Sequence, residues 1–498
     1  MNWKCALTLV VAIAAVSLSS CSGVNNVCTT NCNNSGNAKV TITIFDTPPT
    51  GTSVLSFSLP IVGISLTPSS SSSSPVSVYS PSTITPTEIT RLETDSTLIV
   101  SAASVASGSY TALNLTIGAS SGLFVNYSGA PITYTLNGSS STCVMGAVCQ
   151  LPAGAAGTIS VPINLTLNGN QNQWIGIDMN LNNAIVSTNG ISVNFTLPNV
   201  FTATTTPRTG IPTGSVDTIE DFTGKVTALS NSSITIQNAI TGQTLTAAVN
   251  SSTAYSAAPF AYSNCNNGTP SSCFLVGAIV SMYANLASDG TLTATELDEL
   301  DVAATDEVEG VIYPTLQTNV VGLILFDKTS ASGNTTLSAS TTGYGTPIFL
   351  TSNTSIGYNI DSGPLTAAPG FNPVGFSGSG DLLAGQVVRA QVSSVTTSNN
   401  QINATASNVL LRWSRIPATL NDVAGNSFTL TNIPAYIAAL NTTLSLTPQV
   451  IIYPSYTAFD GVTGTTDTGF VSGAQLAIRT LYLNNNAPAF QANKVRVP

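Results

Sequence analysis

The chain has 498 residues, of which 22 are Asp or Glu, 12 are Lys or Arg and none is His, so its net charge is −10. The lack of histidine excludes Ser-His-Asp and Cys-His catalysis and every histidine-ligated metal site. Acidity without basic clusters argues against nucleic acid as a partner, because a surface that binds nucleic acid needs positive charge. No phosphate-binding glycine motif stands between a strand and a helix, so we expect no nucleotide and no other cofactor.

The first residues are typical of an exported protein. A single Lys4 precedes an apolar run over residues 5–18, which is too short to span about 30 Å of hydrocarbon but has the length of a signal peptide. The run ends in the motif Leu-Ser-Ser-Cys at Cys21, which resembles the lipobox of bacterial lipoprotein precursors. The resemblance implies a signal peptide over residues 1–20, lipid on Cys21 and, since Ser22 stands where Asp would retain the protein at the inner membrane, the outer membrane. An ordinary signal peptide with Cys21 in a disulfide is the alternative.

Six further cysteines, apart from Cys5 and Cys21, fall into three close pairs. In an oxidising compartment the simplest arrangement joins near neighbours, although the sequence leaves other connectivities open. Metal binding is the alternative, which neither a histidine nor a Cys-x-x-Cys spacing supports. The disulfides that we expect are Cys28–Cys32, Cys143–Cys149 and Cys265–Cys273.

The first half of the chain predicts a tether and one domain. Residues 21–37 are small, polar and aperiodic, as in a flexible tether. From residue 38 onward, apolar and polar side chains alternate in short runs between turn residues, which is typical of β-strands. We expect an antiparallel β-sandwich over residues 38–205, in which the serine run 69–74 is a loop, followed by a linker over residues 206–220.

The rest of the chain repeats one sequence pattern over residues 221–303, 304–413 and 414–498. In each segment a Ser or Thr precedes an aromatic residue, a glycine then opens an alternating strand, and one more short strand follows. About five strands in each segment suit a small closed barrel, and the OB-fold is the barrel that we expect. The aromatic residues are Tyr255, Tyr358 and Phe459, and the glycines are Gly277, Gly385 and Gly473.

A closed barrel buries one face of every strand, so one parity of the strand after each glycine should point inward. In the second segment Val387 and Arg389 should share the outward parity, because a buried unpaired arginine costs several kcal/mol. In the first segment the more apolar of two alternating sets should point inward. The more apolar set is Ala278, Val280 and Met282, and the opposite set is Ile279, Ser281 and Tyr283.

Two parts of the chain resemble known families of unknown function. The strand that leads to Asp46 and Pro48, and the later strand entered by Gly108 and Tyr110, are similar to the domain-of-unknown-function family four-three-eight-two, a β-rich module of bacterial lipoproteins. The three repeats resemble the domain-of-unknown-function family five-six-six-six, although the third lacks a glycine that opens the first two. Neither resemblance implies catalytic residues.

Acidic residues crowd the junction of the first and second repeats. Hard oxygen ligands at this density suggest calcium, but their spacing fits no EF-hand loop. Alternation with leucine is typical of a solvated strand face, which is the interpretation that we prefer to a metal site. The calcium candidates are Glu296, Asp298, Glu299 and Asp301.

The sandwich segment holds a second charged group. One interpretation of this group is a glycosidase site, which needs two carboxylates on opposite sides of a cleft. The interpretation that we prefer is ion pairing at the protein surface. Aromatic residues in alternating strands suggest sugar stacking, although core packing explains their pattern better. The charged group is Arg91 with Glu88, Glu93 and Asp95, and the aromatic residues include Trp174 and Trp413.

These observations favour a non-enzymatic, lipid-anchored protein of the cell envelope or surface, whose β-modules bind a glycan or protein ligand or have a structural role. No second apolar segment of about 20 residues, the length that spans a membrane, follows the first, so lipid on Cys21 is the membrane attachment that we expect. The alternative is a glycan-binding or glycan-processing enzyme on the same anchor.

Overall fold

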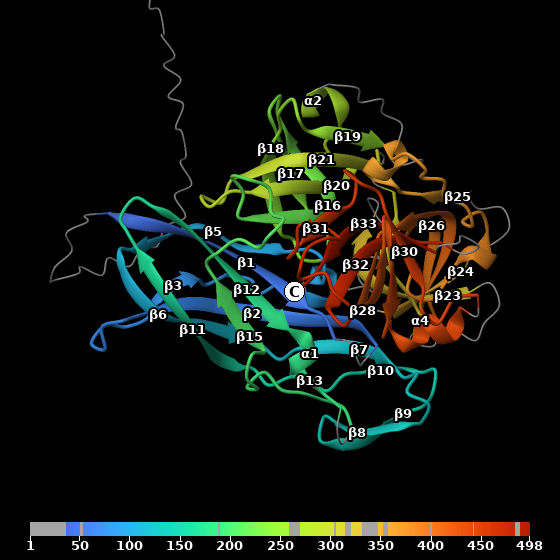
Figure 1. The fold of residues 1–498 in the computed structure, drawn as a ribbon, viewed down its shortest axis with the longest axis horizontal. Helices are drawn as coiled ribbons and strands as arrows, with labels where there is room; N and C mark the ends of the chain where they lie inside the picture. Colours follow the sequence, from blue (N-terminus) through green and yellow to red (C-terminus); the bar gives the residue numbers. More distant parts are fainter. Residues whose placement is uncertain are drawn as a thin grey trace, which may run out of the picture.

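A computed structural model describes residues 36–498 except 50–52, 188–189, 258–268, 303–304, 314–319, 331–346, 352–356, 399–400, 442 and 484–488. The regular secondary structure of the described chain is almost entirely β, as expected: a sandwich-like N-terminal part lies beside a group of compact sheets (Figure 1). The predicted signal peptide, the predicted lipid site Cys21, the predicted pair Cys28–Cys32 and Cys265 lie outside the described residues.

The N-terminal part packs a four-stranded sheet, of order β15-β12-β1-β5, on a seven-stranded sheet in which β2 is central. One apolar cluster contains residues from both sheets, as a sandwich requires. The parallel pairing of β1 with β12 departs from the antiparallel expectation. It arises because the chain passes through the other sheet between these strands. The four-stranded sheet comprises β1 (Asn37–Thr47), β5 (Thr97–Ala106), β12 (Asn172–Asn180) and β15 (Phe201–Thr204).

The other sheet contains β2, the edge strands that pair with it, and β6, β7, β10 and β11. Its strands are β2 (Val54–Pro68), β3 (Val76–Tyr79), β4 (Pro86–Glu88), β6 (Gly108–Ile117), β7 (Ser121–Val125), β10 (Val148–Gln150) and β11 (Gly157–Leu167). The remaining elements of this part are η1 (Ile89–Leu92), β8 (Ile132–Leu136), β9 (Ser139–Cys143), α1 (Leu181–Ala184), β13 (Ile185–Val186) and β14 (Ser192–Val193).

The C-terminal part contains three six-stranded sheets with one topology. Numbered within each sheet, the strands have the order 3-2-1-5-6-4, and strand 3 also pairs in parallel with strand 6, so that five strands close into a barrel. This is the strand arrangement of an OB-like barrel with one added strand, as predicted. We call these sheets barrel 1 (β16–β21), barrel 2 (β22–β27) and barrel 3 (β28–β33).

The strands of barrel 1 are β16 (Asp217–Leu229), β17 (Ser233–Gln237), β18 (Thr244–Ala248), β19 (Ala254–Ala257), β20 (Ile279–Leu286) and β21 (Leu292–Asp301). Those of barrel 2 are β22 (Glu307–Tyr313), β23 (Val320–Thr329), β24 (Pro347–Thr351), β25 (Gly357–Ile360), β26 (Val387–Ser398) and β27 (Gln401–Arg412). Those of barrel 3 are β28 (Ser414–Ala424), β29 (Ser427–Thr431), β30 (Gln449–Ile452), β31 (Ala458–Asp460), β32 (Gln475–Tyr482) and β33 (Phe490–Arg496). Short helices are α2 (Pro270–Cys273), η2 (Gly363–Ala367), η3 (Ser379–Asp381) and α4 (Ala435–Leu440).

The glycine that precedes the fifth strand has the same role in each barrel. Gly277, Gly385 and Gly473 have φ of 103°, 94° and 89°, a region that side chains disfavour. Each also donates its N–H to a carbonyl of the first strand of its own barrel, at 2.8 to 2.9 Å. The glycine therefore turns the chain into the fifth strand while it continues the hydrogen bonding of the barrel.

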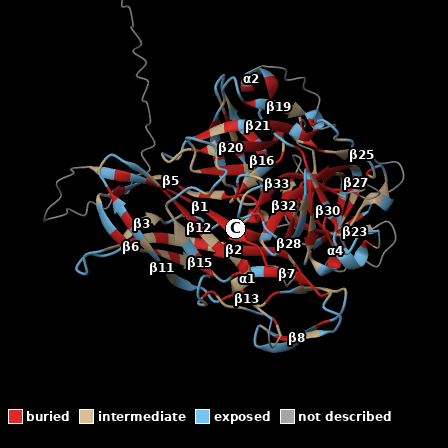
Figure 2. Ribbon diagram, viewed as in Figure 1, coloured by how far each residue is buried: buried red, intermediate tan, exposed pale blue. Residues whose placement is uncertain are grey.

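The predicted parity of the fifth strand is confirmed, but its other face is also buried. Ala278, Val280 and Met282 belong to the core of barrel 1. The opposite set, which includes Ile279 and Ser281, is buried as well because it faces neighbouring parts of the molecule. Figure 2 shows buried residues gathered in the middle of the molecule, where the barrels meet the sandwich.

Disulfide formation is described for one of the predicted pairs. Cys143 and Cys149, which flank a short loop after β9, form a bond whose Cα atoms are 5.9 Å apart. Cys273 lies at the end of α2, whereas its predicted partner Cys265 lies outside the described residues, so that bridge stays a prediction.

We expect peptide mapping without reduction to recover a fragment that links Cys143 to Cys149. Replacing both cysteines with Ala should lower the free energy of unfolding by about 2 to 3 kcal/mol, since a short cross-link restricts the unfolded chain. Recovery of Cys149 joined to any other cysteine would contradict the structure.

Candidate functional site

The most unusual feature of the molecule is that its few charges are concentrated inside it. The chain has 12 Lys and Arg residues, and eight of them form ion pairs whose side chains are largely buried. We call these basic residues, together with the carboxylates that form ion pairs with them, the charged hub. Its basic members are Arg91, Arg208, Arg389, Arg412, Arg415, Arg479, Lys494 and Arg496.

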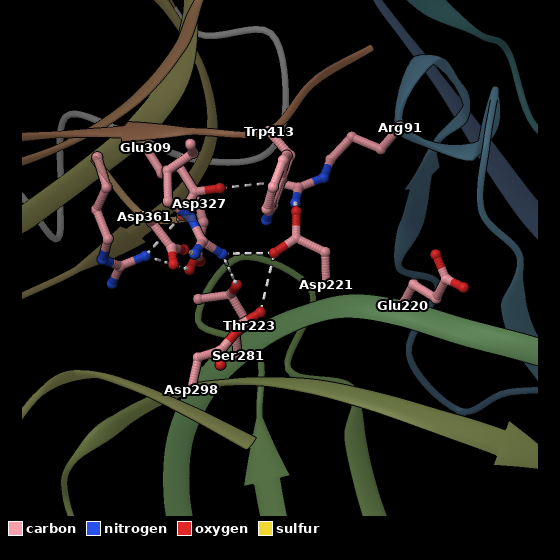
Figure 3. Close-up of polar contacts among 12 residues, drawn as sticks. Arg91, Glu220, Asp221, Thr223, Ser281, Asp298, Glu309, Asp327, Asp361 and Trp413 are labelled. Atoms are coloured by element: carbon pink, nitrogen blue, oxygen red, sulfur yellow. Dashed lines mark hydrogen bonds and ion pairs between the residues drawn. The ribbon is translucent and has the colours of Figure 1, made fainter. Parts of the chain in front are cut away.

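Asp221 is the centre of the hub. It lies where β16 bulges away from β20 and has φ of 53°, so its side chain leaves the barrel. Its Oδ2 accepts from Arg91 of η1 at 3.2 Å and from Arg415 of β28 at 3.1 Å. Its Oδ1 accepts from Arg412 of β27 at 2.5 Å and from the Ser281 hydroxyl at 2.9 Å (Figure 3). One carboxylate thus joins the sandwich and all three barrels.

Electrostatics keep Asp221 ionised. Burial alone would raise its pKa, but Arg412, Arg91 and Arg415 hold the pKa well below its usual value. Breaking such a buried pair leaves uncompensated charge in the protein interior, which is strongly destabilising.

Arg389 points out of barrel 2, as predicted, but it does not reach solvent. Its outward parity is confirmed, because the core of barrel 2 contains Val388 and Ala390 from the same strand. However, Arg389 is only 2% exposed, since it donates to Glu307 at 2.5 Å and to Glu309 at 3.0 Å. The arginine is buried and paired, so the cost of an unpaired charge does not arise. Burial still raises the pKa of Glu307 to about 7, although Arg389 opposes the shift.

A further set of pairs fixes barrel 3 to the sandwich and to barrel 1. Asp95 accepts from Arg415 and Arg479, which lower its pKa to about 2 against the opposing effect of burial. Glu220 of β16 binds Arg479 at 2.6 Å and Lys494 at 3.1 Å. The predicted surface ion pairing around Arg91 is therefore wrong, because Arg91 pairs with Asp221 and not with its sequence neighbours.

The connection between β15 and β16 contributes to the hub through Arg208. Its guanidinium donates to Asp217 and Asp460 at 2.8 Å each and lies over the Phe45 ring. Asp460 also binds Arg496 at 2.8 Å. The connection is therefore tied to barrel 3 as well as to barrel 1.

The acidic junction of the first two repeats is not a solvated strand face. All four calcium candidates on β21 are at most 8% exposed, so this prediction is wrong. Burial and the nearby Asp298 raise the pKa of Glu296 to about 10, which leaves it protonated at neutral pH. Among the described residues, no group of three or more His, Cys, Asp and Glu side chains is arranged to hold a metal ion. The four candidates are Glu296, Asp298, Glu299 and Asp301.

A cavity of about 510 Å³ opens between the sandwich and barrel 1, with parts of barrels 2 and 3 in its wall. Charged hub residues form part of the lining, and threonines, amides and aromatic rings form most of the rest. The tryptophans are not among the lining residues; Trp174 and Trp413 are each 1% exposed and belong to apolar clusters. The charged residues that line the cavity are Glu88, Arg91, Asp95, Glu220, Asp221 and Arg415.

Every carboxylate that lines the cavity already has partners. Glu88 accepts from the Ser56 and Thr90 hydroxyls at 2.7 Å and from the Phe57 N–H at 2.6 Å. The other three bind arginine or lysine in the hub. These carboxylates therefore hold the wall of the cavity in place.

Sequence patterns located Arg91, Asp95 and the acidic junction but paired none of them correctly. The ion-pair partners of Arg91 and Asp95 are 130 to 384 residues away in the chain. The signal that was missed is the placement of Arg479 in the largely apolar strand β32, where an isolated charge requires a buried partner.

We expect Asp221→Asn to lower the free energy of unfolding by about 3 to 5 kcal/mol, because three buried arginines lose the one carboxylate that they share. The control is Asp422→Asn at the exposed end of β28, which should change stability by less than about 0.5 kcal/mol. Chemical denaturation of both variants measures the difference, and equal stabilities would contradict the role of Asp221.

Asp178 should give stability a measurable pH dependence. Burial is the main cause that raises its pKa from 3.8 to about 6. Between these values the folded protein binds more protons at this site than the unfolded chain, so stability falls as pH rises. Asp178→Asn should remove this slope, worth on the order of 1 to 3 kcal/mol. Denaturation curves from pH 4 to pH 6 test this, and an unchanged slope in the variant would refute the assignment.

Known proteins give limited further information. Comparison with curated proteins finds no match. Among solved structures, the Drosophila Unr CSD456 chain aligns over 97% of its length and 56% of this chain, with 10% identity and a TM-score of 0.12. A multidomain protein with nucleic acid binding domains from Streptococcus pneumoniae aligns over 75% of its length and 57% of this chain, with 12% identity and a TM-score of 0.11. Scores this low support no conclusion about this chain.

Residues 37–197 match the family model Domain of unknown function (DUF4382), which confirms the resemblance of the sandwich segment to that family.

Proposed function

We propose that this chain is an exported, lipid-anchored envelope protein that binds a ligand in the cavity between the sandwich and the barrels. The cavity is the observation that carries the proposal. Its volume, about 510 Å³, lies within the range of small-molecule sites. The fixed docking of four β-modules around the hub gives this cavity a preformed shape, which lowers the entropic cost of binding.

A binding role is better supported than catalysis. General acid–base catalysis requires a carboxyl group that is free to exchange a proton with the substrate. Those that line the cavity accept hydrogen bonds from the protein itself. Purified protein should therefore leave chromogenic glycosides intact. Hydrolysis that is lost in Glu88→Gln would instead favour the glycan-processing alternative.

The distribution of basic residues does not favour nucleic acid. Affinity for phosphate backbones depends on accessible lysine and arginine. In the part of the chain that the structure describes, the basic residues outside the hub are Lys39, Lys225 and Lys328. Their small number supports a ligand without a phosphate backbone.

Lipid attachment is proposed from the motif that ends at Cys21. No helix among the described residues is long and apolar enough to cross a membrane. Two or more acyl chains on one cysteine would give stable anchoring, whereas a single chain binds only marginally. The repeats' resemblance to the family five-six-six-six and the outer-membrane location are parts of the same proposal.

Expressed in a bacterium, the full chain should incorporate labelled palmitate and sediment with membranes. Cys21→Ala should abolish both, while Cys5→Ala, a matched change within the apolar run, should leave labelling intact. Palmitate incorporation that persists in Cys21→Ala would overturn the anchor.

A further inference from the structure

We infer that the cavity between the sandwich and barrel 1 binds a neutral, hydroxyl-rich ligand, a carbohydrate in chemical class. The inference rests on the proposed function, since it names the ligand of the same cavity. Three properties of the lining support it: compensated charge, a high content of hydroxyl and amide groups, and half-buried aromatic rings.

The basic groups that line the cavity are already neutralised. Arg91 donates to Asp221 at 3.2 Å and to Glu309 at 3.5 Å. Arg415 binds Asp95 and Asp221. An anionic ligand would have to displace a buried carboxylate from these arginines, which would leave that carboxylate uncompensated. The cavity therefore disfavours an anion and retains polar atoms suited to a neutral ligand.

Uncharged polar side chains form one part of the cavity wall, beside a larger apolar surface. Those that keep some solvent exposure include Thr83, Thr85, Thr87, Thr97, Thr241 and Gln243. A threonine hydroxyl both donates and accepts hydrogen bonds. Sugar hydroxyls have the same double capacity, so these side chains can bind the hydroxyl groups of a polyol.

Aromatic rings complete the site. Tyr79 and Phe222 line the cavity and are only half-buried. Small-molecule sites combine such apolar surfaces with a few placed polar groups. A sugar ring presents apolar C–H faces and polar edges, and it can therefore use both kinds of surface at once.

The test is calorimetry on residues 22–498, which contain every described element. The probes are neutral mono- and disaccharides of glucose, galactose, mannose and N-acetylglucosamine, with glucuronate, inorganic phosphate and a mixed tripeptide library as other classes. We expect saturable binding of at least one neutral sugar. Thr87→Trp, which places a large ring in the cavity, should abolish it.

Tyr79→Ala should weaken sugar binding about tenfold by removing an aromatic contact. Tyr127→Ala is the matched control, because Tyr127 is also half-buried but does not line the cavity. Thermal unfolding confirms that each variant is folded, and Thr97→Trp replaces Thr87→Trp if the latter is not.

The outcomes separate this inference from the proposed function. Binding of glucuronate, phosphate or peptide alone, blocked by Thr87→Trp, would overturn the carbohydrate assignment and leave a ligand-binding cavity. Sugar binding that survives both cavity-blocking variants would overturn the cavity as the site. Absence of binding to every probe class would overturn both proposals.

Discussion

Compensation of buried charge is the constraint on which this structure depends. Asp221 receives three arginines that come from η1 and from two different barrels. Each arginine also contacts a second carboxylate, Glu309 for Arg91 and Arg412 and Asp95 for Arg415. Removal of one carboxylate still leaves excess positive charge in the interior, which is strongly destabilising. The modules are therefore held in one arrangement by a small number of groups, while apolar contacts provide most of the buried surface. Leu98 and Trp174 of the sandwich, for example, belong to the core cluster of barrel 1.

The same charges distinguish three barrels that share a topology. Tyr255 of barrel 1 pairs with Leu297, and Phe459 of barrel 3 pairs with Val495. The two neighbours of Leu297 on its strand are therefore equivalent to the two neighbours of Val495. Barrel 1 has Glu296 and Asp298 there, whereas barrel 3 has Lys494 and Arg496. Lys494 binds Glu220 of barrel 1, and Arg496 donates to the carbonyls of Leu92 and Asp95 in the sandwich, so acidic residues at these positions could not replace them. Complementary charge thus selects one order of docking among modules whose backbones are alike.

Much of the architecture could be predicted because it is encoded locally. Alternating side chains define the strands, and three strand-opening glycines mark the repeat, since each occupies a backbone conformation that other residues disfavour. The hub could not be predicted in the same way. A strand that alternates acidic residues with leucine has one pattern whether its polar face meets water or arginine. The distinction lies in partners such as Arg479, which contacts Asp95 from 384 positions away.

The separation of these partners along the chain has a consequence for biosynthesis. Asp95 precedes Arg415 by 320 residues, and the guanidinium of Arg496, almost the last residue, donates to the carbonyls of Leu92 and Asp95. In synthesis, and in export from the N-terminus, the acidic half of these contacts therefore emerges long before the basic half. Until the final strand emerges, the sandwich and barrel 1 must keep their carboxylates hydrated or protonated. Complete docking is consequently a late event, which a chain interrupted before β33 would not reach.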